Sequence, residues 1–162
     1  THFGHRNLLN ISKANGERFA DIVDRDNLIV ENLNSACGAD DVILHLGDVA
    51  LCARARLESI MASIVCKNIV LVAGNHDRDK SDRYFLDVGI VGVVRTPLMV
   101  RNVLFSHLPI PREQNPMLFA PGVVNIYGHL HERGSLEKGC VSCEVTDYAP
   151  LRLASVIDQL RV

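Results

Sequence analysis

Gly74-Asn75-His76-Asp77 directly follows Ile69-Val70-Leu71-Val72 in this sequence. The short apolar run, rich in β-branched residues, predicts a buried strand. The glycine allows a sharp turn where the strand ends, because it has no Cβ. Ligands of α/β sheets gather at the carboxyl ends of the strands. We therefore expect the amide, imidazole and carboxylate that follow to lie in a functional site.

Three further polar clusters also follow apolar runs, namely His45-Leu46-Gly47-Asp48, Ser106-His107 and Gly128-His129-Leu130-His131. A single histidine or aspartate after a strand is more often a turn or capping residue than a ligand. However, most of the seven histidines stand beside glycines or at predicted strand ends. His129 and His131 flank one residue, so in a strand they would point the same way. We interpret the clusters as parts of one site.

The composition indicates a folded globular protein. The chain has 162 residues, of which 48% are hydrophobic. No apolar run approaches the ~20 residues of a membrane span, and no secretory signal is visible. The net charge is −2 and the sequence has no long block of one charge, which argues against an extended basic surface that binds nucleic acid.

The five cysteines indicate reduced thiols and a cytoplasmic location, because their number is odd and their spacing irregular. Cys140 and Cys143 have the C-x-x-C spacing of some zinc and redox sites. There is no second pair, and Val141 and Val145 favour a strand here, so we disfavour a zinc site.

The predicted elements suggest one α/β domain over residues 1–162, a layered sandwich with a mixed sheet. Apolar periodicity predicts helices over 21–37 and 57–65, and residues 155–160 lean helical. Ser12–Arg18 reads as a polar connection, and the proline-rich residues 108–121 as an irregular loop. Predicted strands cover 42–44, 69–72, 91–94, 97–100, 103–105, 123–127 and 140–145.

The polar clusters and the amino-terminal segment supply six candidate metal ligands: His2, Asp48, Asn75, His107, His129 and His131. Imidazole and carboxylate suit Mn, Fe, Zn, Co or Ni, and we expect Mn²⁺. Six ligands are too many for one tetrahedral ion with an open position. They suit two adjacent divalent ions that share a carboxylate.

Two ions roughly 3.5–4 Å apart form a clamp for in-line displacement at phosphorus and lower the pKa of a bridging water. His76, beside the ligand Asn75, would then be free to protonate the leaving oxygen. The charged stretch from Asp77 to Arg83 is either a solvated loop or a rim where Arg78 meets an anionic substrate.

These motifs resemble, in content and order, those of the calcineurin-like metallophosphoesterases, and G-N-H-D with a later G-H-x-H is highly specific. The resemblance spans almost the whole chain and implies a four-layer α/β/β/α sandwich with a dinuclear metal site. It assigns His2 and His131 to the first metal. It assigns Asn75, His107 and His129 to the second, with Asp48 bridging both.

The resemblance also implies roles for neighbouring residues. His76 would be the general acid or transition-state stabiliser, and Asp77 would orient its loop through backbone hydrogen bonds. The first motif, Thr1-His2-Phe3-Gly4-His5-Arg6-Asn7, resembles that of small bacterial and phage members. By that likeness, we expect His5, Arg6 and Asn7 to face the phosphate.

The first motif departs from the family pattern, D-x-H, whose aspartate stands two residues before the histidine. That position precedes Thr1, and a first strand is missing as well. We expect the sequence to start late within the domain. If the aspartate is absent from the protein, the first metal would bind weakly or not at all.

A second departure bears on the substrate. Val49-Ala50-Leu51 follows Gly47-Asp48 where the protein Ser/Thr phosphatase branch has D-R-G, and His76-Asp77 stands where that branch tends to have H-E. A phosphoprotein substrate is therefore disfavoured. Nearly all residues belong to the core, so no cap domain is expected, and an open site of this kind often accepts varied phosphodiesters or monoesters.

The sequence thus predicts a metal-dependent phosphoesterase, a diesterase in preference to a monoesterase. One alternative is a protein-binding scaffold of the same fold that has lost catalysis. Another is a nuclease acting on short or cyclic nucleotides, since long DNA would need a basic track. The expected partner is a small phosphoester, not a membrane or a long nucleic acid, and no pattern indicates an oligomeric state.

Overall fold

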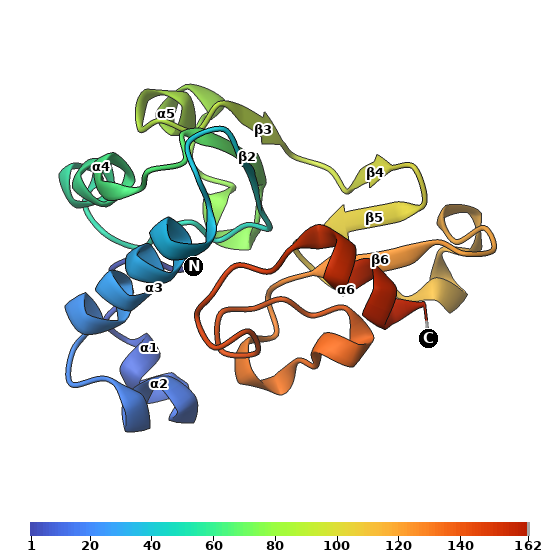
Figure 1. Ribbon diagram of the computed structural model, residues 1–162, viewed down its shortest axis with the longest axis horizontal. Helices are drawn as coiled ribbons and strands as arrows, with labels where there is room; N and C mark the ends of the chain where they lie inside the picture. Colours follow the sequence, from blue (N-terminus) through green and yellow to red (C-terminus); the bar gives the residue numbers. More distant parts are fainter. Residues whose placement is uncertain (162) are drawn as a thin grey trace.

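The computed structural model describes residues 1–161 and has a mixed α/β architecture with two three-stranded sheets (Figure 1). The first sheet has the order β1-β2-β3, and all its strands are parallel. The second has the order β4-β5-β6, with β4 antiparallel and β6 parallel to β5. The predicted α/β class with a mixed sheet is confirmed, whereas the four-layer order stays a prediction. The strands are β1 (Val42–His45), β2 (Asn68–Val72), β3 (Gly92–Val94), β4 (Leu98–Val100), β5 (Val103–Ser106) and β6 (Val124–Tyr127).

The first sheet is covered by α3 (Ile22–Ala36), α4 (Arg54–Ser63) and α5 (Asp82–Asp87). Each helix contributes apolar side chains to one core with the central strand β2. Asp21 begins α3, because its side chain accepts hydrogen bonds from the N–H groups of Val23 and Asp24. The helix predicted over 21–37 is therefore confirmed. The core around this sheet includes Ile29, Leu57, Met61, Ile69, Leu71 and Phe85.

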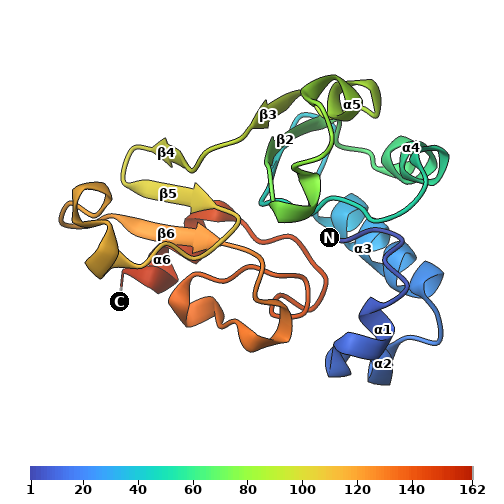
Figure 2. The ribbon, with the colours of Figure 1, turned by 180° about the vertical axis from the view of Figure 1, so that it is seen from behind.

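The second sheet has its own apolar core, to which α6 (Leu153–Leu160) contributes Val156. Figures 1 and 2 show α6 against one face of this sheet from opposite sides of the molecule. The helical tendency of residues 155–160 is therefore confirmed. Burial of Val103 and Phe105 against this helix accounts for the apolar character of β5.

Two predictions about local structure are wrong. Ser12–Arg18 contains the helix α2 (Lys13–Arg18), which Ser12 caps and which follows the short helix α1 (Leu8–Ile11). The capping partners of α2 include a distant glutamate, which local pattern cannot show.

The strand predicted over 140–145 is the second error. Cys140 makes only an isolated bridge with Tyr127, and turns follow. Long-range contacts of Glu144 override the strand propensity of its valine neighbours.

The remaining elements are single turns of 3₁₀ helix, and two of them interrupt the proline-rich loop. Within residues 1–161, no helix is long and apolar enough to cross a membrane. The turns are η1 (Asn75–Asp77), η2 (Arg112–Gln114), η3 (Pro116–Leu118), η4 (His131–Arg133) and η5 (Leu136–Lys138).

Candidate metal centre

Strand register brings four loops to one edge of the two sheets. In the parallel β1–β2 pair, His45 lies opposite Leu71, so the loops after both strands leave from the same edge. In the parallel β5–β6 pair, Ser106 lies opposite Tyr127, and the N–H of Gly128 donates to the carbonyl of His107 at 3.1 Å. The two pairs of loops meet where Nε2 of His107 lies 3.1 Å from Oδ2 of Asp48, so the polar clusters singled out in the sequence lie at one place.

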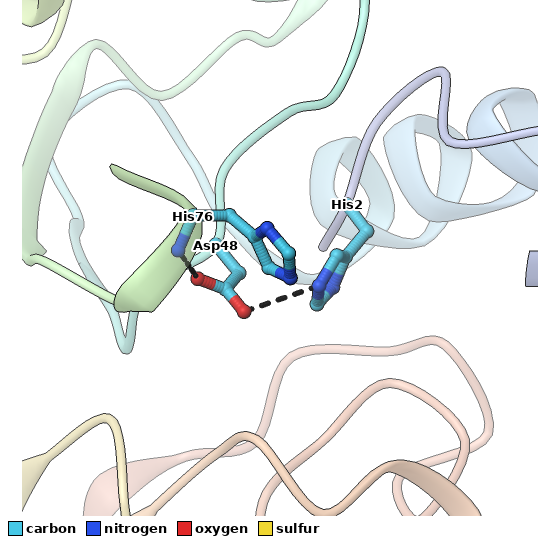
Figure 3. A group of neighbouring side chains, drawn as sticks. All are labelled: His2, Asp48 and His76. Atoms are coloured by element: carbon cyan, nitrogen blue, oxygen red, sulfur yellow. Dashed lines mark hydrogen bonds and ion pairs between the residues drawn. The ribbon is translucent and has the colours of Figure 1, made fainter. Parts of the chain in front are cut away.

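Asp48 lies beside His2 and His76 (Figure 3). Its Oδ2 is 3.1 Å from Nε2 of His2, the contact drawn in that figure. The same oxygen is 3.1 Å from Nε2 of His107. Oδ1 of Asp48 accepts a hydrogen bond from the backbone N–H of His76 at 2.9 Å. Burial by itself would raise the pKa of Asp48, but these contacts outweigh it and hold the pKa well below its usual range. The carboxylate is therefore ionised.

Two groups of side chains share Asp48 and could each hold a metal ion. One comprises His2, Asp48 and His76, and the other comprises Asp48, His107 and His129. The candidate ligand atoms within each group lie within 4.8 Å of one another. The two groups therefore have one carboxylate in common, that of Asp48.

The hydrogen bonds of His107 show that the second group suits a cation. Its Nδ1 lies 2.7 Å from the carbonyl oxygen of Leu46, which can only accept, so Nδ1 carries the proton. In a neutral ring, Nε2 then has only a lone pair. This Nε2 lies 2.9 Å from Oδ1 of Asn75 and 3.1 Å each from Asp48 Oδ2 and His129 Nδ1. A divalent cation bound there would take the lone pair of Nε2 in place of a hydrogen bond from Nε2 to Asp48.

Further histidine rings surround His2. Its ring centroid is 4.8 Å from that of His131, 5.5 Å from that of His76 and 5.9 Å from that of His5. Burial lowers the pKa of His2 to about 4, which leaves the ring neutral and able to ligate at pH 7. Burial also lowers the pKa of His129 and His5.

Close backbone packing explains the glycines of two motifs. A Cβ on Gly74 would lie 2.6 Å from the backbone nitrogen of Asp48 and would also clash with its carboxylate. Gly47 has φ +89°, and a Cβ there would lie 2.6 Å from Nδ1 of His107. No larger residue allows the loops to approach this closely.

Four candidate ligands have left-handed backbone conformations. The φ angles of His2, Asp48, His129 and His131 are 56°, 54°, 66° and 50°. Such a conformation costs a non-glycine residue roughly 1–2 kcal/mol. Strain of this kind clusters at functional sites, where surrounding contacts enforce it. The backbone is therefore bent to aim these side chains at a common point.

The residues Arg6, Asn7 and Arg78 were also predicted from the sequence to belong to the site. All three are exposed, and their side chains make no hydrogen bond or ion pair with the part of the chain that the structure describes. Their expected contact with substrate stays a prediction. By contrast, the expected backbone role of Asp77 is confirmed, because its carboxylate accepts from the N–H groups of Asp48, Val49 and Gly74.

Sequence reasoning missed a buried polar network beside the histidines. Arg25 and Glu144 form a buried ion pair, and Nδ1 of His131 lies 3.3 Å from Oε1 of Glu144. Asp26 accepts from the N–H of Gly4, next to the first motif. The one signal in the sequence was the charged pair Arg25-Asp26 within the helix predicted over 21–37.

Comparison with known families agrees with this geometry. The family described as calcineurin-like phosphoesterase matches residues 2–139. The chain belongs to the calcineurin-like phosphoesterase family. Members of this family depend on metal ions, and the two groups around Asp48 supply residues that could bind them.

One similar solved structure supports the fold. A protein of unknown function from Aquifex aeolicus has 24% identity and a TM-score of 0.68, over 98% of this chain and 94% of that one. A nuclease, MPE, from Pseudomonas putida has 28% identity and a TM-score of 0.38, over 54% of this chain and 42% of that one. The comparison with curated proteins gave no match.

Proposed function

We propose that this calcineurin-like phosphoesterase hydrolyses phosphoester bonds with a dinuclear metal centre, and that Mn²⁺ is the expected metal, with Fe, Zn, Ni or Co as substitutes. The observation that carries the proposal is the sharing of Asp48 by two ligand groups. In this proposal, His2 and His131 bind one ion, and Asp48 bridges the two ions. The ligands of the other ion are Asn75, His107 and His129.

The bound ions would neutralise charge on the phosphoryl oxygens and lower the pKa of an attacking water molecule. The protein's own residues would orient the substrate and protonate its leaving oxygen. His76 is exposed beside the buried His2, so its ring can reach a substrate while its backbone N–H holds Asp48. We propose that this ring donates a proton to the leaving oxygen.

The proposed substrate is a small phosphodiester or phosphomonoester. The exposed Arg6, Asn7 and Arg78, with the partly buried His5, are proposed to contact its phosphate. The net charge of −2 argues against a long nucleic acid. We also propose a cytoplasmic location, because all five cysteines are free thiols.

We propose further that residues 1–162 belong to a single domain whose first strand and D-x-H aspartate precede Thr1. β1 pairs only with β2, and Val42 of β1 is 68% exposed. A cavity of about 1020 Å³, bordered by both sheets, is lined by Ile43 and Leu44 of β1. A strand beside β1 would fill this space. We expect the full-length gene product to bind more metal per chain and to have a higher urea midpoint of unfolding than residues 1–162. Equal metal content and equal midpoints would refute the missing strand.

Hydrolysis assays test the enzymatic proposal. We expect the full-length protein to hydrolyse bis-p-nitrophenyl phosphate when Mn²⁺ is added, faster than p-nitrophenyl phosphate. His76→Ala should lower kcat by about 10²–10⁴-fold and leave the number of bound metals unchanged. Asp79→Asn, at an exposed neighbour, is the matched control.

Three outcomes would contradict parts of this proposal. Full activity in metal-loaded His76→Ala would exclude the proton-donor role. Loss of a metal in that variant would make His76 a ligand, as its place in the group with His2 and Asp48 also permits. Metal binding without turnover would indicate a scaffold that has lost catalysis.

A further inference from the structure

A buried ion pair lies beside the proposed metal centre but contains none of the proposed ligands. Nη2 of Arg25 is 3.4 Å from Oε1 of Glu144, and their side chains are 0% and 1% exposed. Arg25 comes from α3, whereas Glu144 comes from the turns before α6. The pair therefore joins two segments that are far apart in the sequence.

Arg25 holds the backbone next to His2. Its Nη1 donates to the carbonyl oxygen of Thr1 at 2.8 Å, and its Nε donates to Oδ1 of Asn15 at 2.6 Å. The peptide that joins Thr1 to His2 is thereby fixed by a buried guanidinium. His2 itself has a left-handed φ of 56°.

Glu144 holds the ring of His131. Its Oε1 lies 3.3 Å from Nδ1 of His131 and accepts from Nδ2 of Asn15 at 2.8 Å. An ionised carboxylate can only accept, so Nδ1 of the ring carries a proton, and in a neutral ring Nε2 is the nitrogen with the lone pair. A carboxylate that fixes the tautomer and orientation of a ligating histidine is a recurrent outer layer of metal sites.

Stability by itself is a poor explanation for this pair. Taking two charges out of water costs several kcal/mol each, and apolar residues of the same size often serve as well or better. Asn15 extends the network to Tyr148, because its Oδ1 also accepts from that hydroxyl at 3.1 Å. Hydrogen bonds on both sides of the pair restrain it, which is what positioning requires.

We propose that the Arg25–Glu144 pair positions His2 and His131 as the two histidines of one metal site, a role that rests on the proposed dinuclear centre. Arg25 bonds the carbonyl that precedes His2, Glu144 bonds the ring of His131, and the centroids of the two rings are 4.8 Å apart. The other site is fixed differently, through the carbonyl of Leu46, which receives the proton of His107. Loss of the pair should therefore affect one site selectively.

Calorimetric titration of the metal-free, full-length protein with Mn²⁺ tests this proposal. We expect two sites in the wild type. Glu144→Leu should weaken one of them by about 10–100-fold and leave the other unchanged. Glu144→Gln keeps the Oε1 acceptor and should recover part of the loss. Glu58→Gln, in an exposed pair with Arg54, is the charge-matched control and should bind as the wild type does.

A spectroscopic readout separates positioning from a general structural effect. In long-range ¹H–¹⁵N spectra of the Zn²⁺-loaded wild type, His131 should show a protonated Nδ1 and a metal-bound Nε2. Glu144→Gln should shift that pattern while far-UV circular dichroism and the urea midpoint show a folded protein. If Glu144→Leu does not fold, the same measurements are made on Glu144→Gln and Arg25→Lys instead.

The outcomes are distinct. Two sites of wild-type affinity in folded Glu144→Gln and Glu144→Leu would overturn the positioning role, and so would equal weakening of both sites. A wild-type protein that binds no metal would overturn the proposed function itself, whatever the variants do.

Discussion

Asp77 Oδ2 accepts a hydrogen bond from the backbone N–H of Asp48 at 2.7 Å. The same oxygen accepts from the N–H of Gly74 at 2.8 Å, and Oδ1 accepts from Val49 at 3.2 Å. One buried carboxylate thus ties the loop after β1 to the loop after β2. It acts through the backbone, and this explains why the motif that contains Asn75 ends in an aspartate.

Asp77→Asn tests this coupling. An amide of the same shape has one accepting oxygen instead of two, so buried N–H groups lose a partner. We expect a loss of about 1.5–3 kcal/mol in the free energy of unfolding, measured by urea titration, together with weaker Mn²⁺ binding. The exposed Asp79→Asn serves as the control, and equal stability of the two variants would show that Asp77 does not tie the loops.

Gly74→Ala should damage the metal centre directly. Its Cβ would lie 2.6 Å from the backbone nitrogen of Asp48, so the bridging carboxylate must move. We expect loss of at least one bound metal, counted by elemental analysis of the folded variant. Gly92→Ala is the matched control, because a Cβ there meets Val70 at an ordinary 3.9 Å. Full metal content in Gly74→Ala would be inconsistent with this packing.

Removal of metal should destabilise the protein. Nε2 of His107 lies close to Oδ1 of Asn75 and Oδ2 of Asp48, so these atoms could bind one cation. A cation that binds only the folded state stabilises that state by about 2.7 kcal/mol when its concentration is 100 times its Kd. With a protein of this size, that corresponds to a rise in Tm of roughly 5–10 °C. Differential scanning calorimetry with EDTA and then excess Mn²⁺ measures it. His107→Ala should lose most of the response; an unchanged Tm in the wild type would count against a metal site.

Tyr148 gives a prediction about alkaline pH. Burial raises its pKa to about 12, above the ordinary value of about 10. The folded state therefore favours the protonated phenol, so its contribution to stability is complete below pH 10 and is lost progressively as the pH rises towards 12. At pH 11, ionisation of the unfolded state should cost the wild type roughly 1 kcal/mol.

Comparison with Tyr148→Phe isolates this effect. Urea titrations at pH 8 and pH 11 should show a larger loss of stability in the wild type than in the variant, because phenylalanine has no proton to lose. Equal losses would indicate that Tyr148 titrates at its ordinary pKa when folded. The phenylalanine variant also loses the hydrogen bond to Asn15, so its stability at pH 8 is the reference.

The sequence predicted most of the elements near the site because their signals are local. The apolar run before Gly74 and the periodic face of α3 each depend on a few neighbouring residues. Two pairings of loops were also foreseeable, Asp48 with Asn75 and His107 with His129, since paired parallel strands bring their carboxyl ends to one edge of a sheet. The meeting of the two sheets at this edge depends on long-range contacts.

The buried network was not foreseeable, because its contacts are long-range. Glu144 follows a segment with strand propensity, and only contacts with Asn15 and Arg25 show that it serves another purpose. Likewise, α2 is stabilised by Glu132, whose carboxylate accepts from Ala14 at 2.7 Å across 118 positions of sequence. Single-residue patterns contain no information about such partners.

We propose that two cations bind on either side of Asp48. Crystals of the full-length protein grown with Mn²⁺, measured at a wavelength where manganese scatters anomalously, would show them. We expect two anomalous peaks roughly 3.5–4 Å apart, one beside His2 and His131, the other beside His107 and His129. A single peak would reduce the centre to one metal, and the absence of any peak within ligand distance of Asp48 would refute the metal centre.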